Sequence, residues 1–516
     1  MNKLSTIKAI DPNQLKNIFS KSLIGIEKEG LRISENKISQ TPHPESLGSS
    51  LYNRSITTDF SEAQIELVTP PFEDKAELLE YLDCLHHFIH SNIKEESFWP
   101  CSMPPPIESE SDIPIANFGS SGLGEFRTLY RKGLSLRYGR LMQAISGVHF
   151  NYSIPRLIWQ KKEINPTGIS ESEISSKLYF RLLRNMIRNN WCVLYFFGAS
   201  PVVTGNFIPK GSVSFKKLTD DTYYMPFATS LRMSRYGYRN VSREMINVSS
   251  RSLEEYIRDI TEATNTPREK ESKSRGIKGY NTSQINNNIL QIDDEYYAIA
   301  RPKSMGTNYM RTTKNLEKGG VDFIELRSID LNPYSRIGIE KNAIKFLELL
   351  AIHCLLKPDS EISDFELEEI NHNEKIISEK GREKGLMLKR DGRSISLRSI
   401  GKELIEDLRI LLDNFQDDDG YIEALNIADD QLKHPDSTIS ARMIDEILTN
   451  KISFSDYGTN LADTNKSYYE QITPENNKYW SNFVENAKNS IEKQKQRERT
   501  CNEDIDDVLM RYFRSD

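Results

Sequence analysis

The sequence predicts an α+β fold: a mainly antiparallel sheet with helices on its outer face, followed by a helical C-terminal part. Two observations predict it. Over the first two-thirds of the 516 residues, segments rich in Ile, Val and Phe with partial period-two patterning alternate with long helical patterns. From about residue 340 onward the patterning is almost wholly helical. A chain of this length typically forms two or three domains.

The expected elements follow one another along the chain. Strand patterns occupy residues 22–33, 62–69, 146–154, 285–300 and 321–329. One long helical pattern, 73–96, begins just after Pro70-Pro71, and another, 174–198, is closed by Gly198. The polar, patternless stretch 264–282 is expected to be a mobile loop.

The last part of the chain is divided by polar breaks at 357–364, 416–420 and 434–437. We therefore expect a core of sheet and helices over residues 1–340 and a mostly helical region, packed on that core, over residues 341–516.

Charge and composition exclude several classes of partner. The net charge of −7 provides no global positive field for nucleic acid or an anionic membrane. The start, MNKLSTIKAI, lacks the features of a signal peptide, and the longest apolar stretch, about 191–203, is too short to span a bilayer. Five scattered cysteines without a CxxC pair indicate free thiols. We expect a cytoplasmic protein without nucleic-acid or membrane partners.

Strand periodicity places charged residues together. Glu27 and Glu29 are two residues apart, so they project from the same face of their strand. The same spacing pairs Glu325 with Arg327 and His149 with Asn151, and it puts Glu62 and Glu66 on one face. Asp59 lies just before one of these strands.

If these strands share a sheet, one face gathers several carboxylates and one imidazole. Neighbouring carboxylates repel and raise each other's pKa, and divalent cations relieve that repulsion. Oxygen ligands with one His suit Mg²⁺ or Mn²⁺ better than Zn²⁺. The same periodicity is also typical of a solvated sheet face, and spacing alone does not separate the two readings. The sequence has no P-loop, so a nucleotide would be held through metals.

Longer segments carry a family resemblance. They are GIEKEGLR (25–32), HPESLGSSL (43–51), ITTDFSEAQIELVTP (56–70), FWPCSMP (98–104), FRTLYRKGLSLRYGRLMQAISGVHFNYSIP (126–155), FFGASP (196–201), FATSLRMSRYGYRN (227–240), YAIARPK (297–303) and GGVDFIELRSIDLNP (319–333). These segments closely resemble the proteobacterial type of glutamate–cysteine ligase, the first enzyme of glutathione synthesis. Residues 304–318 and the chain beyond about 455 follow the family poorly, and Phe227 stands where tyrosine is expected.

The resemblance implies a fold and a reaction. The fold would be similar to that of glutamine synthetase, with the antiparallel sheet forming a funnel-shaped active site and residues 1–340 as the catalytic core. ATP would phosphorylate the γ-carboxylate of L-glutamate, and the amine of L-cysteine would displace the phosphate to give γ-glutamylcysteine. The cofactor would be Mg²⁺ or Mn²⁺, with ATP as co-substrate, and the protein would be a monomer.

The resemblance also implies roles for individual residues. The metal ligands would be Glu27, Glu29, Asp59, Glu66, His149 and Glu325. Arg327 would stabilise the transferring phosphoryl group, although an ion pair with Glu325 also explains it. Arg232 would grip the substrate glutamate, a task suited to a guanidinium group, although a surface arginine is the alternative.

Two further groups of residues complete the implied site. The cysteine pocket would be lined by Phe60, Tyr130, Leu134, Tyr238 and Tyr297, for which ordinary core packing is the alternative. Arg131 and Lys303 are nominated for ATP phosphate contacts, against a solvated-surface role.

Two other functions are consistent with the sequence. One is a ligase of the same chemistry that uses a different amine. The other is an inactive scaffold or regulatory binder, although all six nominated metal positions keep coordinating side chains.

Overall fold

An eight-stranded sheet lies at the centre of the structure, a computed structural model that describes residues 12–156, 170–209, 211–237, 246–268, 283–306, 310–413, 420–500 and 503–514. The strand order is β10-β11-β6-β1-β4-β3, and the short strands β2 and β5 pair with the last residues of β1. All these pairs are antiparallel. The strands are β1 (Leu23–Ser34), β2 (Lys37–Ile38), β3 (Ile56–Thr58), β4 (Gln64–Val68), β5 (Ser97–Phe98), β6 (Val148–Ser153), β10 (Ala300–Lys303) and β11 (Phe323–Ile329).

Helices cover one face of this sheet. A single hydrophobic core joins Ile26, Phe150 and Leu326 of the sheet to α2 (Lys75–Asn92), α5 (Glu171–Phe196) and α8 (Lys341–Leu356). Because side chains alternate along a strand, the residues between these apolar positions project from the opposite face. The predicted α+β fold, with an antiparallel sheet and helices on one face, is therefore confirmed.

The two long helices predicted in the first half of the chain form, and their caps show why they begin there. The Asp74 side chain accepts hydrogen bonds from the N–H groups of Ala76 and Glu77 at the start of α2. Ser170 accepts one from the N–H of Glu173 at the start of α5.

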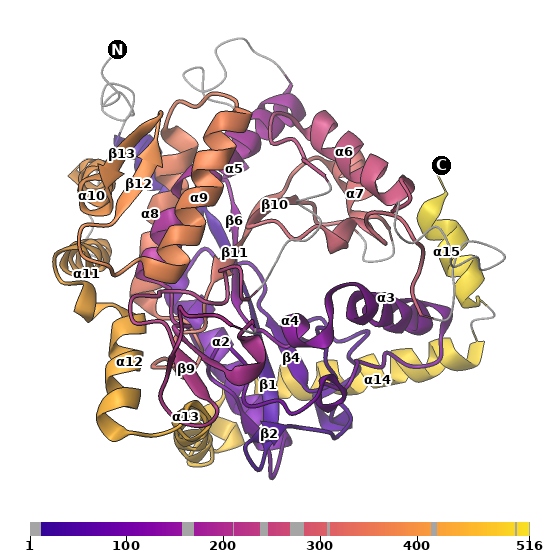
Figure 1. The fold of residues 1–516 in the computed structure, drawn as a ribbon. Helices are drawn as coiled ribbons and strands as arrows, with labels where there is room; N and C mark the ends of the chain where they lie inside the picture. Colours follow the sequence, from indigo (N-terminus) through magenta and orange to yellow (C-terminus); the bar gives the residue numbers. More distant parts are fainter. Residues whose placement is uncertain are drawn as a thin grey trace.

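The remaining elements of the first part surround the sheet. The elements of the first part not yet described are α1 (Pro12–Lys21), α3 (Gly122–Tyr138), α4 (Arg140–Gln143), α6 (Leu253–Asn265), α7 (Thr312–Gly319) and a small sheet of β7 (Val202–Thr204), β9 (Thr222–Tyr224) and β8 (Lys216–Lys217). In Figure 1, α3, α6 and α7 lie to the right of the central sheet, and α8 and α9 (Asp364–Lys380) lie to its left.

The C-terminal part is mostly helical, as predicted, with one hairpin that the prediction missed. Its helices are α9 (Asp364–Lys380), α10 (Leu397–Asp413), α11 (Tyr421–Lys433), α12 (Ile439–Asn450), α13 (Phe454–Tyr469), α14 (Trp480–Thr500) and α15 (Ile505–Phe513). The hairpin joins β12 (Met387–Arg390) to β13 (Arg393–Ser396). Its two turn residues, Asp391 and Gly392, both have positive φ, which favours the Asp-Gly dipeptide found there.

The strand predicted at 285–300 is wrong except at its last residue, where β10 begins. Backbone N–H groups in this segment donate to side-chain oxygens rather than to the carbonyl oxygens of a neighbouring strand. The N–H of Ile285 donates to the Gln291 amide oxygen at 3.1 Å, and the N–H of Gln291 donates to the Glu295 carboxylate at 2.7 Å. The segment is therefore a buried, folded loop with a short 3₁₀ turn at Asp293–Glu295.

Three other predictions concern loops, membranes and thiols. Helix α6 includes the first residues of the stretch 264–282, of which 269–282 lie outside the described residues. None of the helices in the described ranges is both long and apolar enough to cross a bilayer. Four cysteines are buried and free of disulfides, namely Cys84, Cys101, Cys192 and Cys354.

His353 makes the helical core sensitive to acid. It is fully buried in α8, and burial, assisted by the charge of Lys357, lowers its pKa to about 3. An imidazole in the unfolded chain titrates near 6.5. The unfolded state therefore binds a proton that the folded state does not bind between these values, so stability is lost as the pH falls through that window.

We expect His353→Leu to reduce this loss. Over about pH 4.5 to 6.5, the wild-type free energy of unfolding should fall by up to about 1.4 kcal/mol per pH unit more than that of the variant. Thermal or urea unfolding at several pH values measures the difference, and the exposed His434, as His434→Gln, serves as control. Equal acid sensitivity of wild type and His353→Leu would contradict the assignment.

Candidate active site

The register of four strands places the predicted charged residues side by side on the face opposite the helices. Glu27 lies opposite His149 across the β1–β6 pair, and Glu29 lies opposite Glu66 across the β1–β4 pair. Glu325 lies opposite Asn151 across the β11–β6 pair. The convergence predicted from strand periodicity is therefore confirmed for these residues.

His149 lies at the centre of this face. Its Nδ1 donates to Glu27 Oε2 at 3.0 Å and lies 3.7 Å from Glu325 Oε1. Its Nε2 lies 3.6 Å from Glu29 Oε1. One ligand atom each from Glu27, His149 and Glu325 lie within 4.8 Å of one another, close enough to hold a metal ion.

Arginines surround the Glu325 end of the face. Glu325 accepts a hydrogen bond from Arg327 Nη1 and another from Arg301 Nε, each at 3.1 Å. Burial alone would raise the pKa of Glu325, but the charges of Arg327 and Arg301 hold it well below its ordinary value. The ion pair between Arg327 and Glu325 that the sequence suggested is therefore present.

The other end of the face is more acidic. Burial, followed by the charges of Glu27 and Asp59, raises the pKa of Glu66 well above its ordinary value. Burial also raises the pKa of Glu29, although His149 lies close to it. Burial is the largest cause of both shifts, and a divalent cation beside these carboxylates would stabilise their ionised forms.

Glu62, predicted to share this face with Glu66, does not lie on the strand. It lies in the turn before β4, and its carboxylate accepts hydrogen bonds from the N–H groups of His43 at 2.8 Å and Asn117 at 2.7 Å. The strand begins only at Gln64, so the periodicity that paired Glu62 with Glu66 does not extend that far.

Arg232 is buried beside the cluster, so the surface-arginine alternative is wrong. It is 3% exposed, its Nη2 donates to the carbonyl oxygen of Arg327 at 2.9 Å, and its Nη1 lies 3.7 Å from Asp330 Oδ1. Gly147 permits this position, because a Cβ there would overlap the Arg232 guanidinium group. The N–H of Gly147 also donates to Glu29 Oε2 at 2.9 Å.

Four of the five residues nominated for the cysteine pocket gather in one hydrophobic cluster. Phe60, Leu134 and Tyr297 are buried members of it, and Tyr130 packs against it. Tyr238 lies outside the described residues. This packing is compatible both with a pocket lining and with the core role that the sequence left open.

The two residues nominated for phosphate contacts differ in their surroundings. Arg131 is buried, donates to the backbone carbonyls of Thr58 and Asp59, and lies 4.2 Å from the Phe118 ring centre. It therefore fixes the backbone at Asp59, and the solvated-surface alternative is wrong for it. Lys303 on β10 is half-buried, and its Nζ lies 3.9 Å from Asp294 Oδ1.

Comparison with known proteins identifies the family. A family model described as glutamate-cysteine ligase matches residues 7–377. This chain belongs to the glutamate–cysteine ligase family. A glutamate–cysteine ligase from Shewanella halifaxensis is 38% identical over 95% of this chain and 95% of its own length, and one from Pseudomonas fluorescens is 34% identical over 96% and 94%.

Solved structures agree with this family assignment. The crystal structure of glutamate–cysteine ligase from Francisella tularensis in complex with AMP superposes with a TM-score of 0.88 at 29% identity, covering 95% of this chain and 97% of that one. A bifunctional glutathione synthetase from Pasteurella multocida shares the fold, with a TM-score of 0.68 at 24% identity over 89% of this chain and 53% of that one.

Three groups that hold these carboxylates were not assigned that role from the sequence: Asn151, which the periodicity placed on this face, Arg301 and the Gly147 N–H. Asn151 donates to Glu27 Oε1 at 2.9 Å, and Arg301 and the Gly147 N–H were described above. The spacing of Arg301 and Lys303, two residues apart in ARPK, was a signal that both share one strand face. No pattern in the sequence indicated that a backbone N–H would bind Glu29.

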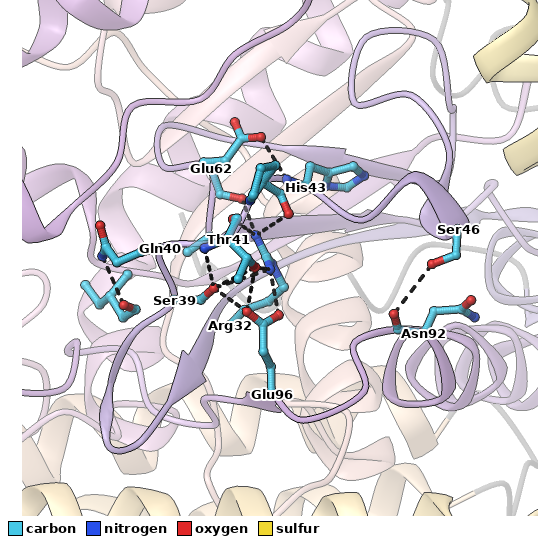
Figure 2. Close-up of polar contacts among 12 residues, drawn as sticks. Arg32, Ser39, Gln40, Thr41, His43, Ser46, Glu62, Asn92 and Glu96 are labelled. Carbon is cyan, nitrogen blue, oxygen red and sulfur yellow. Dashed lines mark hydrogen bonds and ion pairs between the residues drawn. The ribbon is translucent and has the colours of Figure 1, made fainter.

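A buried arginine near the end of β1, Arg32, lies at the centre of a polar network that Figure 2 shows. Arg32 donates to the Glu96 carboxylate at 2.6 Å and to the Thr41 hydroxyl at 2.7 Å. It also donates to the carbonyl oxygen of Glu62 at 3.1 Å, in the turn between Asp59 and β4. This network ties β1 to the segment that carries Asp59.

We expect Arg32→Met to destabilise the protein by about 3–5 kcal/mol, because Glu96 would remain as a buried, uncompensated charge. Urea unfolding measures the effect. Lys37→Met, which breaks the exposed pair with Glu108, is the control and should leave stability nearly unchanged. Equal effects of the two substitutions would show that the Arg32 network is not a structural anchor.

Proposed function

We propose that this protein joins the γ-carboxylate of L-glutamate to the amine of L-cysteine at the expense of ATP, the first step of glutathione synthesis. The reaction is that of its family, whose model matches residues 7–377. The observation that carries the mechanism is the gathering of carboxylates, one imidazole and two arginines on one sheet face.

The architecture suits this reaction. We take the sheet face with these charges to be the wall of a funnel-shaped active site, similar to that of glutamine synthetase. Residues 1–340 would form the catalytic core, and residues 341–516 the helical region packed on it. The hydrophobic core shared by the sheet, α8 and α11 supports this division.

The residues present fit divalent cations. We assign as ligands Glu27, Glu29, Asp59, Glu66, His149 and Glu325. Five carboxylates and one imidazole form a set that suits Mg²⁺ or Mn²⁺. Burial, followed by the charges of neighbouring carboxylates, raises the pKa of Glu66, so a bound cation would favour its ionised form. When bound, such cations would supply positive charge that stabilises the charge developing on the transferring phosphoryl group.

The ligand atoms that converge most closely and the carboxylates with raised pKa values belong to different members of this set. Three ligand atoms converge at Glu27, His149 and Glu325. The pKa values of Glu29 and Glu66 are the ones raised, whereas that of Glu325 is held low by arginines. Because Glu325 is already neutralised by Arg327 and Arg301, we expect the Glu29 and Glu66 end to contribute most to cation affinity.

The first chemical step is phosphoryl transfer. The glutamate γ-carboxylate attacks the γ-phosphorus of ATP, ADP leaves, and an acyl phosphate forms. Arg327 is placed to stabilise charge on the transferring group, with Glu325 orienting its guanidinium group through the 3.1 Å hydrogen bond. Lys303, two residues from Arg301 on β10, adds positive charge beside Glu325. Arg131 is proposed for phosphate contacts as a buried positive charge, since its guanidinium nitrogens donate to the carbonyl oxygens of Thr58, Asp59 and Arg127.

The second step forms the amide bond. The cysteine amine attacks the acyl carbon, phosphate leaves, and the amine loses a proton. Arg232, held by the Arg327 carbonyl and by Asp330, would bind a carboxylate of glutamate. The cluster of Phe60, Leu134 and Tyr297, with Tyr130 against it, would enclose the thiol side chain, and Tyr238 would join it. Positioning rather than covalent catalysis by the protein would carry the rate.

The proposal is tested by the reaction itself. Purified protein with ATP, Mg²⁺, glutamate and cysteine should release ADP and form γ-glutamylcysteine, and a chelator should abolish both. ADP release that does not depend on cysteine, or a strong preference in kcat/KM for another amine, would refute cysteine as the acceptor.

Glu325→Gln should lower kcat by roughly 10²-fold or more while thermal unfolding stays cooperative, because it removes a charge that orients Arg327 and a proposed metal ligand. Glu317→Gln, in an exposed carboxylate of α7, is the matched control and should retain wild-type kcat. Wild-type kcat for Glu325→Gln would show that this face is not the catalytic centre.

A further inference from the structure

The last helix, α15, packs against two separate segments that carry residues of the proposed cysteine pocket. One hydrophobic cluster contains Phe126 and Leu129 of α3, Ile285 and Ile292 of the loop before β10, and residues of α15. The α15 members are Val508, Leu509 and Tyr512. In Figure 1, α15 lies beside α3 at the right of the view.

Contact between α15 and α3 is close. The rings of Tyr512 and Phe126 have centres 5.2 Å apart. A Cβ on Gly122, the first residue of α3, would lie 2.6 Å from the carbonyl oxygens of Glu503 and Asp504. Gly122 therefore allows the start of α3 to approach the backbone that precedes α15, and the ring contact holds the two helices together.

The loop before β10 is fixed at its other side. Arg311 Nη2 donates to Asp293 at 2.7 Å, and the Thr313 N–H donates to the same carboxylate at 2.9 Å. Phe513 of α15 lies next to this network, with its ring centre 6.0 Å from the Arg311 guanidinium carbon. This loop leads to Tyr297.

Tyr130 links the two hydrophobic clusters. It packs against the α15 cluster and also against the cluster of Phe60, Leu134 and Tyr297. The C-terminal half of α3 is joined to the loop by a buried ion pair between Arg137 and Glu295 at 2.9 Å. The N-terminal half, which leads to Tyr130, is joined to it through the cluster centred on α15.

We propose that α15 is a positioning element of the acceptor site: it sets the distance between Tyr130 on α3 and the loop that carries Tyr297. This inference rests on the proposed function, because it assigns these walls to the cysteine pocket. Helix α15 lies outside residues 7–377, which the family model matches. Among the described residues, it reaches the pocket through Tyr130 and the loop, so its effect should fall on cysteine rather than on glutamate.

Full-length Tyr512→Ala tests the proposal, because it removes the ring that packs on Phe126. The KM for cysteine should rise about tenfold, while the KM for glutamate and kcat at saturating cysteine stay within about twofold of wild type. Tyr512→Phe, which keeps the ring, should restore the wild-type KM. Met510→Ala, on the exposed side of the same helix, is the matched control and should behave as wild type.

A merely structural role predicts a different result. Loss of folded protein would lower the measured kcat and leave the KM values for cysteine and glutamate unchanged, and that outcome would overturn the proposal, as would an unchanged KM for cysteine. If Tyr512→Ala does not fold, Tyr512→Leu, which keeps most of the volume, is measured with the same expectation. Wild-type protein that forms no dipeptide would refute the proposed function itself, which separates that failure from a failure of the α15 proposal.

Discussion

The antiparallel register of β6, β1 and β4 is the constraint on which the site depends. It places His149 opposite Glu27 and Glu66 opposite Glu29, so four ionisable side chains meet on one face. A shift of one residue in β1 would turn both glutamates into the helix-covered core. The apolar residues between them, such as Ile26, make that shift costly, because they are buried against α2, α5 and α8.

Positive and negative side chains are distributed unevenly over this face of the sheet. Glu325 is flanked by Arg327 and Arg301, which hold its pKa low, whereas burial and neighbouring carboxylates raise the pKa of Glu66. A cluster that neutralised itself completely would have little need of metal ions. A face with arginines at one end and excess carboxylates at the other can hold cations and still present fixed positive charge to a transferring phosphoryl group.

Much of this site could be predicted from the sequence because strand periodicity is local. The spacing of Glu27 and Glu29, and of Glu325 and Arg327, fixed which side chains share a face before any strand pairing was known. The strand predicted at 285–300 did not form, because side chains there accept the backbone hydrogen bonds that a neighbouring strand would otherwise accept. Glu62 was wrongly placed on a strand, because β4 begins only at Gln64. The Asp391-Gly392 dipeptide is typical of a hairpin turn, but it lies within a long run of helical patterns, and the hairpin was not predicted.

Partners that depend on tertiary contact could not be predicted. The Gly147 N–H that binds Glu29, and the packing of Arg232 against Gly147, depend on how the start of β6 and the segment after β9 meet. The contact of α15 with α3 joins residues far apart in the sequence through ordinary apolar side chains, which carry no local signature. Only the folded chain shows these relations.

Diffraction from crystals grown with Mn²⁺ and a non-hydrolysable ATP analogue tests the central claim most directly. Anomalous difference peaks should lie in direct contact with carboxylate oxygens of Glu27, Glu29 and Glu66 on the face of the sheet opposite the helices. Glu66→Gln should weaken or remove at least one peak while the sheet is retained. Nucleotide bound with Mn²⁺ elsewhere, and no peak on this face, would contradict the account.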